Sequence, residues 1–149
     1  MTRTPEKAAI RVVLCDDVAE LRRLVREVLE ESAGIEVIDE AGTGRECVRI
    51  TSERRPDVLV LDLSMPDMDG LEALPLISQG SPGTGIVVFS GFAADRMRAP
   101  AMQLGADCYI EKGAPLDSLA AAVHDVARGD RAAGRRRSRD GGSGMESSV

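Results

Sequence analysis

Three aspartates directly follow apolar stretches of this 149-residue chain. Asp62 comes after the run Val58 to Leu61, and Asp16 and Asp17 come after a run that ends at Cys15. Short apolar runs of this kind are typical of strands buried on both faces, so each carboxylate is expected at a strand end. A carboxylate there is costly unless an opposite charge compensates it, and a compensated one can act as a nucleophile or a metal ligand.

The elements that must position these carboxylates alternate regularly along the chain. Strands are predicted over 10–15, 35–41, 58–62, 85–90 and 108–111, and helices over 18–32, 44–55, 70–78, 95–104 and 115–127. Five repeats of strand and helix predict an α/β fold, with a parallel sheet covered by helices on both faces. The second strand alternates apolar and polar residues, which favours the edge of the sheet.

Polar residues at the ends of four predicted strands could meet at one site. Ligands of open parallel sheets bind where the strand order reverses, and in the order 2-1-3-4-5 that point would bring Asp16, Asp17 and Asp62 together. Crowded carboxylates favour a hard cation such as Mg²⁺, which often shares its ligands with a phosphate. Ser90 adds a hydroxyl and Lys112 a positive charge, so the set predicts a site at which Asp62 attacks phosphorus.

These residues resemble the receiver domain of bacterial two-component response regulators. The resemblance covers about residues 9–128 and includes the following matches: Asp16-Asp17, the DLSMPDMDG run that starts at Asp62, Ser90-Gly91, Gly105-Ala106-Asp107, Tyr109 and Lys112. It implies a flavodoxin-like, doubly wound (βα)5 fold with strand order 2-1-3-4-5, an order carried over from the chemotaxis receiver.

The resemblance also implies roles for the acidic residues. Asp62 is expected to accept a phosphoryl group from a histidine of a sensor kinase. Asp17 and Asp62 are expected to bind Mg²⁺ directly, together with the main-chain carbonyl of Ser64, while Asp16 acts through a water molecule.

The same resemblance implies how phosphorylation is sensed. Lys112 and Ser90 are expected to hold the phosphoryl oxygens, and Tyr109 to turn inward when Ser90 moves toward the phosphate. The face from the fourth to the fifth helix is then expected to bind a downstream protein partner.

Two positions depart from the family pattern. Gly113 and Ala114 separate Lys112 from Pro115, where the family usually has proline directly after the lysine, so no cis peptide bond is predicted there. Pro100 lies inside the fourth predicted helix and should kink it or delay its start.

Composition favours a globular protein, with 43% hydrophobic and 30% charged residues. No apolar run is long enough to cross a bilayer, and the N-terminus lacks the apolar core of a signal peptide, so a cytoplasmic protein without membrane contact is expected. The cysteines Cys15, Cys47 and Cys108 have no metal-ligand spacing. They are expected to be reduced, with Cys15 and Cys108 buried as small apolar residues.

The domain boundaries follow from composition. We expect a disordered leader over 1–9, the receiver over 10–128 and a basic, disordered tail over 129–149. Six arginines from Arg128 onward could contact nucleic-acid phosphates. The tail lacks an apolar face that could form a base-reading element, so no specific nucleic-acid binding is expected.

Three functions are compatible with these sequence features. The leading hypothesis is a signalling switch, not an enzyme, that acts on a protein partner and catalyses only phosphotransfer to, and hydrolysis from, Asp62. The second is the receiver half of a transcriptional regulator whose DNA-binding domain is absent from this chain; the full genomic reading frame would distinguish the two. The third is a Mg²⁺-dependent phosphatase, but such enzymes usually carry a second aspartate where this chain has Ser64, and turnover of a phosphomonoester would reveal one.

Overall fold

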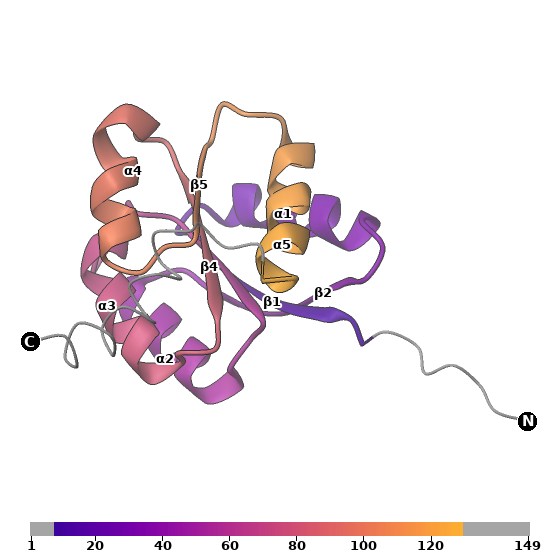
Figure 1. The fold of residues 1–149 in the computed structure, drawn as a ribbon, viewed down its shortest axis with the longest axis horizontal. Helices are drawn as coiled ribbons and strands as arrows, with labels where there is room; N and C mark the ends of the chain where they lie inside the picture. Colours follow the sequence, from indigo (N-terminus) through magenta and orange to yellow (C-terminus); the bar gives the residue numbers. More distant parts are fainter. Residues whose placement is uncertain (1–7, 130–149) are drawn as a thin grey trace, which may run out of the picture.

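The computed structural model describes residues 8–129, in which strands and helices alternate (Figure 1). The strands are β1 (Ile10–Cys15), β2 (Ile35–Ala41), β3 (Val58–Leu61), β4 (Gly85–Ser90) and β5 (Cys108–Glu111). The helices are α1 (Ala19–Glu31), α2 (Gly44–Arg54), α3 (Gly70–Gly80), α4 (Ala94–Gln103) and α5 (Leu116–Ala127). Within residues 8–129, no helix is both long and apolar enough to cross a membrane.

All strand pairs are parallel, and the order in the sheet is β2-β1-β3-β4-β5. The predicted fold class and strand order are therefore confirmed, and the weakly apolar β2 lies at an edge. The register of β1 with β3 pairs Cys15 with Leu61, so Asp16 and Asp62 follow the last paired residues of neighbouring strands. This register brings the two carboxylates to one edge of the sheet.

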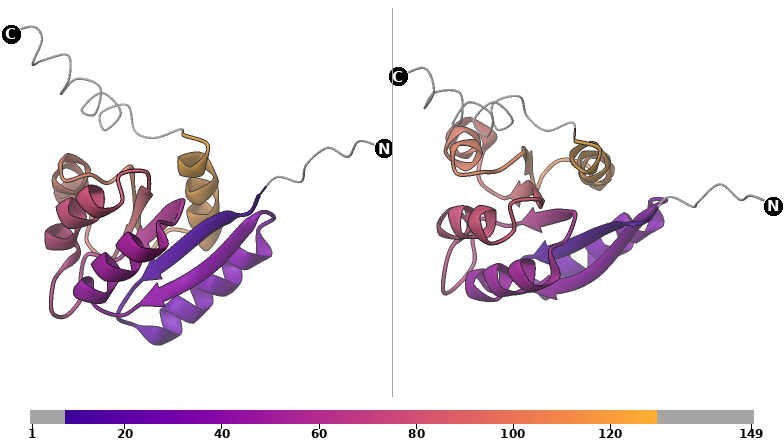
Figure 2. Two further views of the ribbon diagram at one scale, coloured as in Figure 1. Left: turned by 90° about the horizontal axis from the view of Figure 1, so that it is seen from below. Right: turned by 60° about the horizontal axis from the view of Figure 1, so that its bottom comes forward.

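The sheet lies between two groups of helices, as Figures 1 and 2 show. Alternate strand residues such as Val12 and Val60 pack with Leu29 of α1 and Leu119 of α5. The intervening residues pack against the other three helices; Leu59, for example, belongs to the same buried cluster as Ile50, Leu74 and Ala101. Period-two strands that are apolar on both faces explain this double burial.

Two expectations about helix geometry need adjustment. The third helix extends to Gly80, beyond the predicted end. Pro100 lies within α4 but does not delay its start, because the helix begins at Ala94. None of the peptide bonds within residues 8–129 is cis. Residues 1–7 and 130–149, which include most of the predicted leader and all but the first residue of the predicted basic tail, lie outside the described residues.

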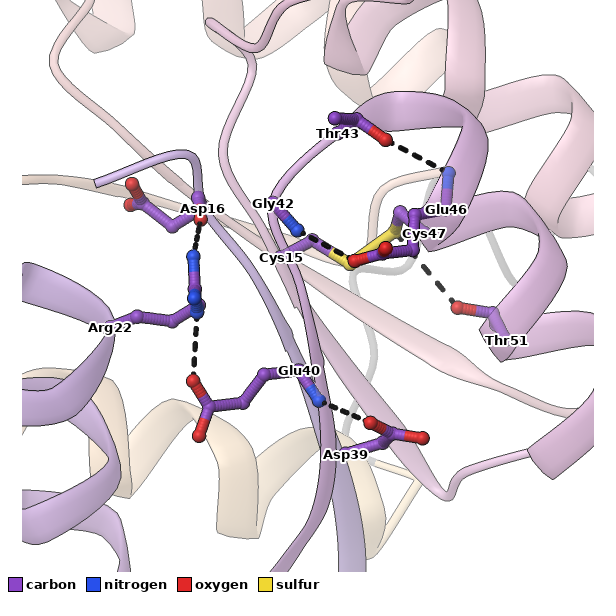
Figure 3. Close-up of a disulfide and its surroundings, with 10 residues drawn as sticks. All are labelled: Cys15, Asp16, Arg22, Asp39, Glu40, Gly42, Thr43, Glu46, Cys47 and Thr51. Carbon is purple, nitrogen blue, oxygen red and sulfur yellow. Dashed lines mark hydrogen bonds and ion pairs between the residues drawn. A yellow bond between two sulfur atoms is a disulfide. The ribbon is translucent and has the colours of Figure 1, made fainter. Parts of the chain in front are cut away.

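The expectation of reduced cysteines is contradicted, because Cys15 and Cys47 form a disulfide (Figure 3). Cys15 ends β1 and Cys47 lies in α2, and their Cα atoms are 5.9 Å apart, within the usual range for a disulfide. Both residues are buried, so the predicted burial of Cys15 is confirmed while its free thiol is not. Cys108 is a free cysteine as expected, but it is only partly buried, so the predicted burial of this residue is wrong.

Reduction of this disulfide should destabilise the fold. The two cysteines are 32 residues apart, and closing a loop of that length contributes about 3 to 4 kcal/mol in the chain-entropy account. Thermal unfolding with and without a thiol reductant should therefore differ by about 10 °C. A Cys47→Ala protein should have the lower melting temperature with or without the reductant. The melting temperature of Cys108→Ala should fall on reduction as that of the wild type does. Equal melting temperatures of the oxidised and reduced wild type would contradict the disulfide.

Candidate functional site

Three carboxylates meet beyond the carboxyl ends of β1 and β3. Asp16, Asp17 and Asp62 each place a carboxylate oxygen within 4.8 Å of the other two. Asp62 is only 3% exposed and Asp16 only 7% exposed, while Asp17 is exposed. The predicted acidic cluster is therefore present, with two of its members withdrawn from water.

Main-chain groups hold the two buried aspartates in place. The Asp62 N–H donates to the carbonyl of Cys15 (2.9 Å), which joins the end of β3 to the end of β1. The Asp62 carboxylate accepts from the N–H of Ser64 (3.2 Å), and the Asp16 carboxylate accepts from the N–H of Val18 (2.9 Å). Each acidic side chain is thus fixed by the turn that follows its own strand.

Lys112 compensates both buried carboxylates. Its Nζ lies 2.9 Å from Oδ2 of Asp16 and 3.3 Å from Oδ2 of Asp62, and 5.9 Å from the ring centre of Phe89. Burial lowers the pKa of Lys112, but its hydrogen bonds and charge attraction to the two aspartates outweigh this, and the net pKa is raised. The two aspartates therefore favour the charged form of Lys112.

The surroundings of Asp62 disfavour the ionised form of its carboxylate. Burial raises its pKa most; the charge of Asp16 adds to the rise, and the Ser64 N–H and Lys112 oppose it without cancelling it. A further positive charge near Asp62 would therefore stabilise the ionised carboxylate.

The two predicted switch residues are connected through Phe92. Ser90, fully buried at the end of β4, accepts a hydrogen bond on Oγ from the N–H of Phe92 (3.1 Å). Tyr109 of β5 donates its hydroxyl to the carbonyl of Phe92 (2.8 Å). Ser90 is also tied to the site, because its carbonyl accepts from the N–H of Lys112 (2.8 Å). One loop residue therefore contacts both Ser90 and Tyr109.

Two glycines allow the loop after β3 to pack closely. A Cβ at Gly70 would lie 2.6 Å from the main-chain oxygen of Asp62, and a Cβ at Gly44 would lie 1.9 Å from that of Met68. Asp67 and Asp69 shape this loop and do not belong to the carboxylate cluster. Asp67 has a positive φ of 76°, and Asp69 caps α3 through a hydrogen bond from the N–H of Glu72.

The donor set suits Mg²⁺. Hard oxygen ligands from one or two carboxylates, completed by water and substrate oxygens, are what this ion prefers. Asp16, Asp17 and Asp62 offer three carboxylates at one point, and Asp17 is open to solvent. Ser64, whose main-chain oxygen is the further ligand that the family resemblance implies, is exposed and lies two residues after Asp62.

Two contributors to the site were missed from the sequence. Phe92 acts through its main-chain atoms, so its residue type gives no signal. Arg22 of α1 donates to the carbonyl of Asp16 and pairs with Glu40. The sequence did offer a signal for Arg22, because a basic residue five positions after Asp17, near the start of the predicted helix, can reach back to the acidic turn.

Neutralising Asp62 should stabilise the metal-free protein. Its raised pKa means that folding disfavours the charged form, so an Asp62→Asn protein should melt a few degrees higher in EDTA. Asp57→Asn is a matched control, because Asp57 precedes β3 at the opposite end of the strand and uses one carboxylate oxygen as an acceptor that an amide can replace. Thermal unfolding measures both, and a lower melting temperature for Asp62→Asn would contradict the assigned electrostatics.

Comparison with known proteins agrees with this geometry. Residues 12–124 match the family model of the response regulator receiver domain. A crystal structure of a two-component response regulator of the LuxR family, from Aurantimonas sp. SI85-9A1, superposes with a TM-score of 0.79 at 29% identity. The superposition covers 83% of this chain and 89% of that one.

The curated relatives are longer than this chain. An uncharacterized transcriptional regulatory protein of Bacillus subtilis, YhcZ, is 37% identical over 100 residues, which are 67% of this chain and 47% of the relative. A protein-glutamate methylesterase/protein-glutamine glutaminase 1 of Paramagnetospirillum magneticum is 40% identical over 123 residues, 80% of this chain and 32% of the relative. This chain therefore spans less than half the length of either relative.

Proposed function

Because the chain belongs to the response regulator receiver family, we propose that it accepts a phosphoryl group on Asp62 and thereby switches a protein-binding surface. The supporting observation is the position of Lys112, whose ammonium group reaches the carboxylates of both Asp16 and Asp62 at the ends of neighbouring strands. The proposed donor is a phosphohistidine of a sensor kinase. The proposed recipient of the signal is a protein partner at the face formed by α4, β5 and α5.

Asp62 is the nucleophile in this proposal. One carboxylate oxygen attacks phosphorus, a P–O bond forms, and the P–N bond to the kinase imidazole breaks, with the electron pair returning to the ring nitrogen. Lys112, already beside Asp62, balances negative charge on the phosphoryl oxygens. The buried setting of Asp62 strengthens this interaction, because little water competes for it.

Mg²⁺ is the proposed cofactor. Asp17, Asp62 and the carbonyl of Ser64 would hold it directly, with Asp16 acting through water. The ion supplies positive charge that offsets the repulsion between the carboxylates and the incoming phosphoryl group. This fits the crowding of three carboxylate oxygens within 4.8 Å.

The switch would work through Phe92. Phosphoryl oxygens on Asp62 offer Ser90 a new acceptor, and a Ser90 hydroxyl drawn toward them gives up its bond from the Phe92 N–H. The Phe92 carbonyl, which accepts from Tyr109, is then free to move with the loop. The contacts of Ser90 and Phe92 would differ between the unphosphorylated and the phosphorylated protein. This difference would provide the free energy for the inward turn of Tyr109.

Phosphorylation should require Asp62. Incubation with acetyl phosphate and Mg²⁺ should add one phosphoryl group to the wild type and none to Asp62→Asn, as measured by intact mass. Lys112→Met should slow the reaction about 100-fold, the usual effect of removing one charge-stabilising group. EDTA should abolish it.

Asp57→Asn serves as the control for this experiment, because Asp57 lies at the far end of β3. It should be phosphorylated at the wild-type rate. An Asp62→Asn protein that still gains a hydroxylamine-labile phosphate would disprove the assignment of the acceptor.

Activation should also change the surroundings of Tyr109. It is the sole tyrosine of the chain, and there is no tryptophan, so tyrosine fluorescence reports this position alone. Beryllofluoride with Mg²⁺, a stand-in for the phosphoryl group, should change that fluorescence in the wild type and leave Ser90→Ala nearly unchanged. Identical responses of the two proteins would show that Ser90 does not transmit the signal.

A second candidate is the receiver part of a transcriptional regulator. The likeness to YhcZ favours it, since that protein is named as a transcriptional regulatory protein and this chain spans 47% of it. The genomic reading frame tests this candidate. A continuation beyond Val149 that encodes a helix-turn-helix domain would support it, and a stop codon there would contradict it.

A further inference from the structure

Arg22 of α1 connects the acidic turn after β1 to the edge strand β2 (Figure 3). Its Nη1 donates to the main-chain oxygen of Asp16, and its Nε lies 2.7 Å from Oε1 of Glu40. The Arg22 side chain is only 21% exposed and lines a small cavity together with Asp16 and Asp62. A planar guanidinium that binds two fixed acceptors has little freedom to reorient.

Glu40 is itself firmly held. Its second carboxylate oxygen lies 2.7 Å from Nη1 of Arg26. Burial raises the pKa of Glu40, but the hydrogen bonds from Arg22 and Arg26 outweigh burial and leave it lowered, so the carboxylate stays charged. The next residue, Ala41, accepts the N–H of Asp16 at 3.0 Å. Both main-chain polar groups of Asp16 are therefore anchored to β2, one directly and one through Arg22.

The oxygen that Arg22 binds belongs to the peptide group between Asp16 and Asp17. Peptide groups are planar, so the direction of this oxygen sets the course of the chain from one aspartate to the other. Asp17 is exposed, whereas Asp16 is held by Lys112 and the Val18 N–H. Of the three clustered carboxylates, that of Asp17 therefore depends most on the orientation of this peptide.

We propose that Arg22 is a positioning residue for the cation site. Held by Glu40, it binds the Asp16–Asp17 peptide and thereby fixes where the carboxylates of Asp16 and Asp17 point. This inference rests on the proposed function, because the cation concerned is the Mg²⁺ of that site. Groups that orient metal ligands without touching the metal typically change its affinity about 10- to 100-fold.

Charge and positioning predict different results for Arg22, which makes the proposal testable. Arg22 carries a positive charge near a cation site, so its removal would by Coulomb's law favour cation binding. Arg22→Lys keeps the charge but loses the planar fork that reaches Asp16 and Glu40 together. This variant therefore separates positioning from charge.

The experiment is a calorimetric Mg²⁺ titration of the wild type, Arg22→Lys and Arg23→Lys. Arg23 is the exposed neighbour of Arg22 on α1 and serves as the matched control. Arg22→Lys should bind Mg²⁺ about tenfold more weakly, and Arg23→Lys should bind it as the wild type does. The rate of phosphorylation by acetyl phosphate should recover in Arg22→Lys at saturating Mg²⁺, because the catalytic groups themselves are intact.

Glu40→Gln tests the route of this effect. If Arg22 acts through Glu40, the combined Arg22→Lys/Glu40→Gln protein should lose less Mg²⁺ affinity than the sum of the two single losses. Additive losses would overturn this route. Thermal unfolding in EDTA measures any loss of stability separately from metal binding.

The outcomes distinguish this inference from the proposed function. Equal or tighter Mg²⁺ binding by Arg22→Lys, with wild-type binding intact, would overturn the positioning role and leave phosphorylation of Asp62 standing. A wild-type protein that binds no Mg²⁺ would overturn both.

Discussion

The cost of keeping Asp62 charged at the end of a buried strand constrains much of this structure. Asp62 is 3% exposed, and burial raises its pKa more than neighbouring groups lower it. Lys112 offsets part of this cost at 3.3 Å and does the same for Asp16 at 2.9 Å. Lys112 follows β5, which lies two positions away from β3 in the sheet. The pairing therefore depends on the parallel arrangement, which brings the carboxyl ends of all these strands to one edge.

The turns beyond that edge are adapted to the same requirement. The main chain of β1 accepts the Asp62 N–H, and Gly70 leaves room for the main-chain oxygen of Asp62 to approach α3. On the other side of the cluster, Arg22 donates to the main-chain oxygen of Asp16 and forms a partly buried ion pair with Glu40. A rigid frame of this kind suits the proposed site, in which a cation and a phosphoryl group would be bound in a fixed relation. Lys112 offsets only part of the cost of ionising Asp62, and a bound cation would offset more of it.

The sequence predicted those features that depend on local patterns. Apolar runs located the five strands, and the polar residues at their ends located Asp16, Asp62 and Lys112 in one site. The disulfide of Cys47 could not be predicted, because it depends on how α2 rotates against the sheet and not on any spacing along the chain. The part played by Phe92 was hidden as well, since it uses main-chain atoms that every residue type possesses. The strand order came from family resemblance, because strand periodicity alone does not determine which strands are neighbours.

The central claim is that Asp62, alone among the three clustered carboxylates, acts as the nucleophile. Borohydride reduction of the protein after treatment with acetyl phosphate and Mg²⁺ tests it directly, because an aspartyl phosphate is reduced to homoserine while free aspartate is not. Tandem mass spectrometry of the digested protein should find homoserine at position 62 and aspartate at positions 16 and 17. Homoserine at either of those two positions would contradict the claim. So would aspartate at position 62 after reduction of protein that intact mass had shown to be phosphorylated.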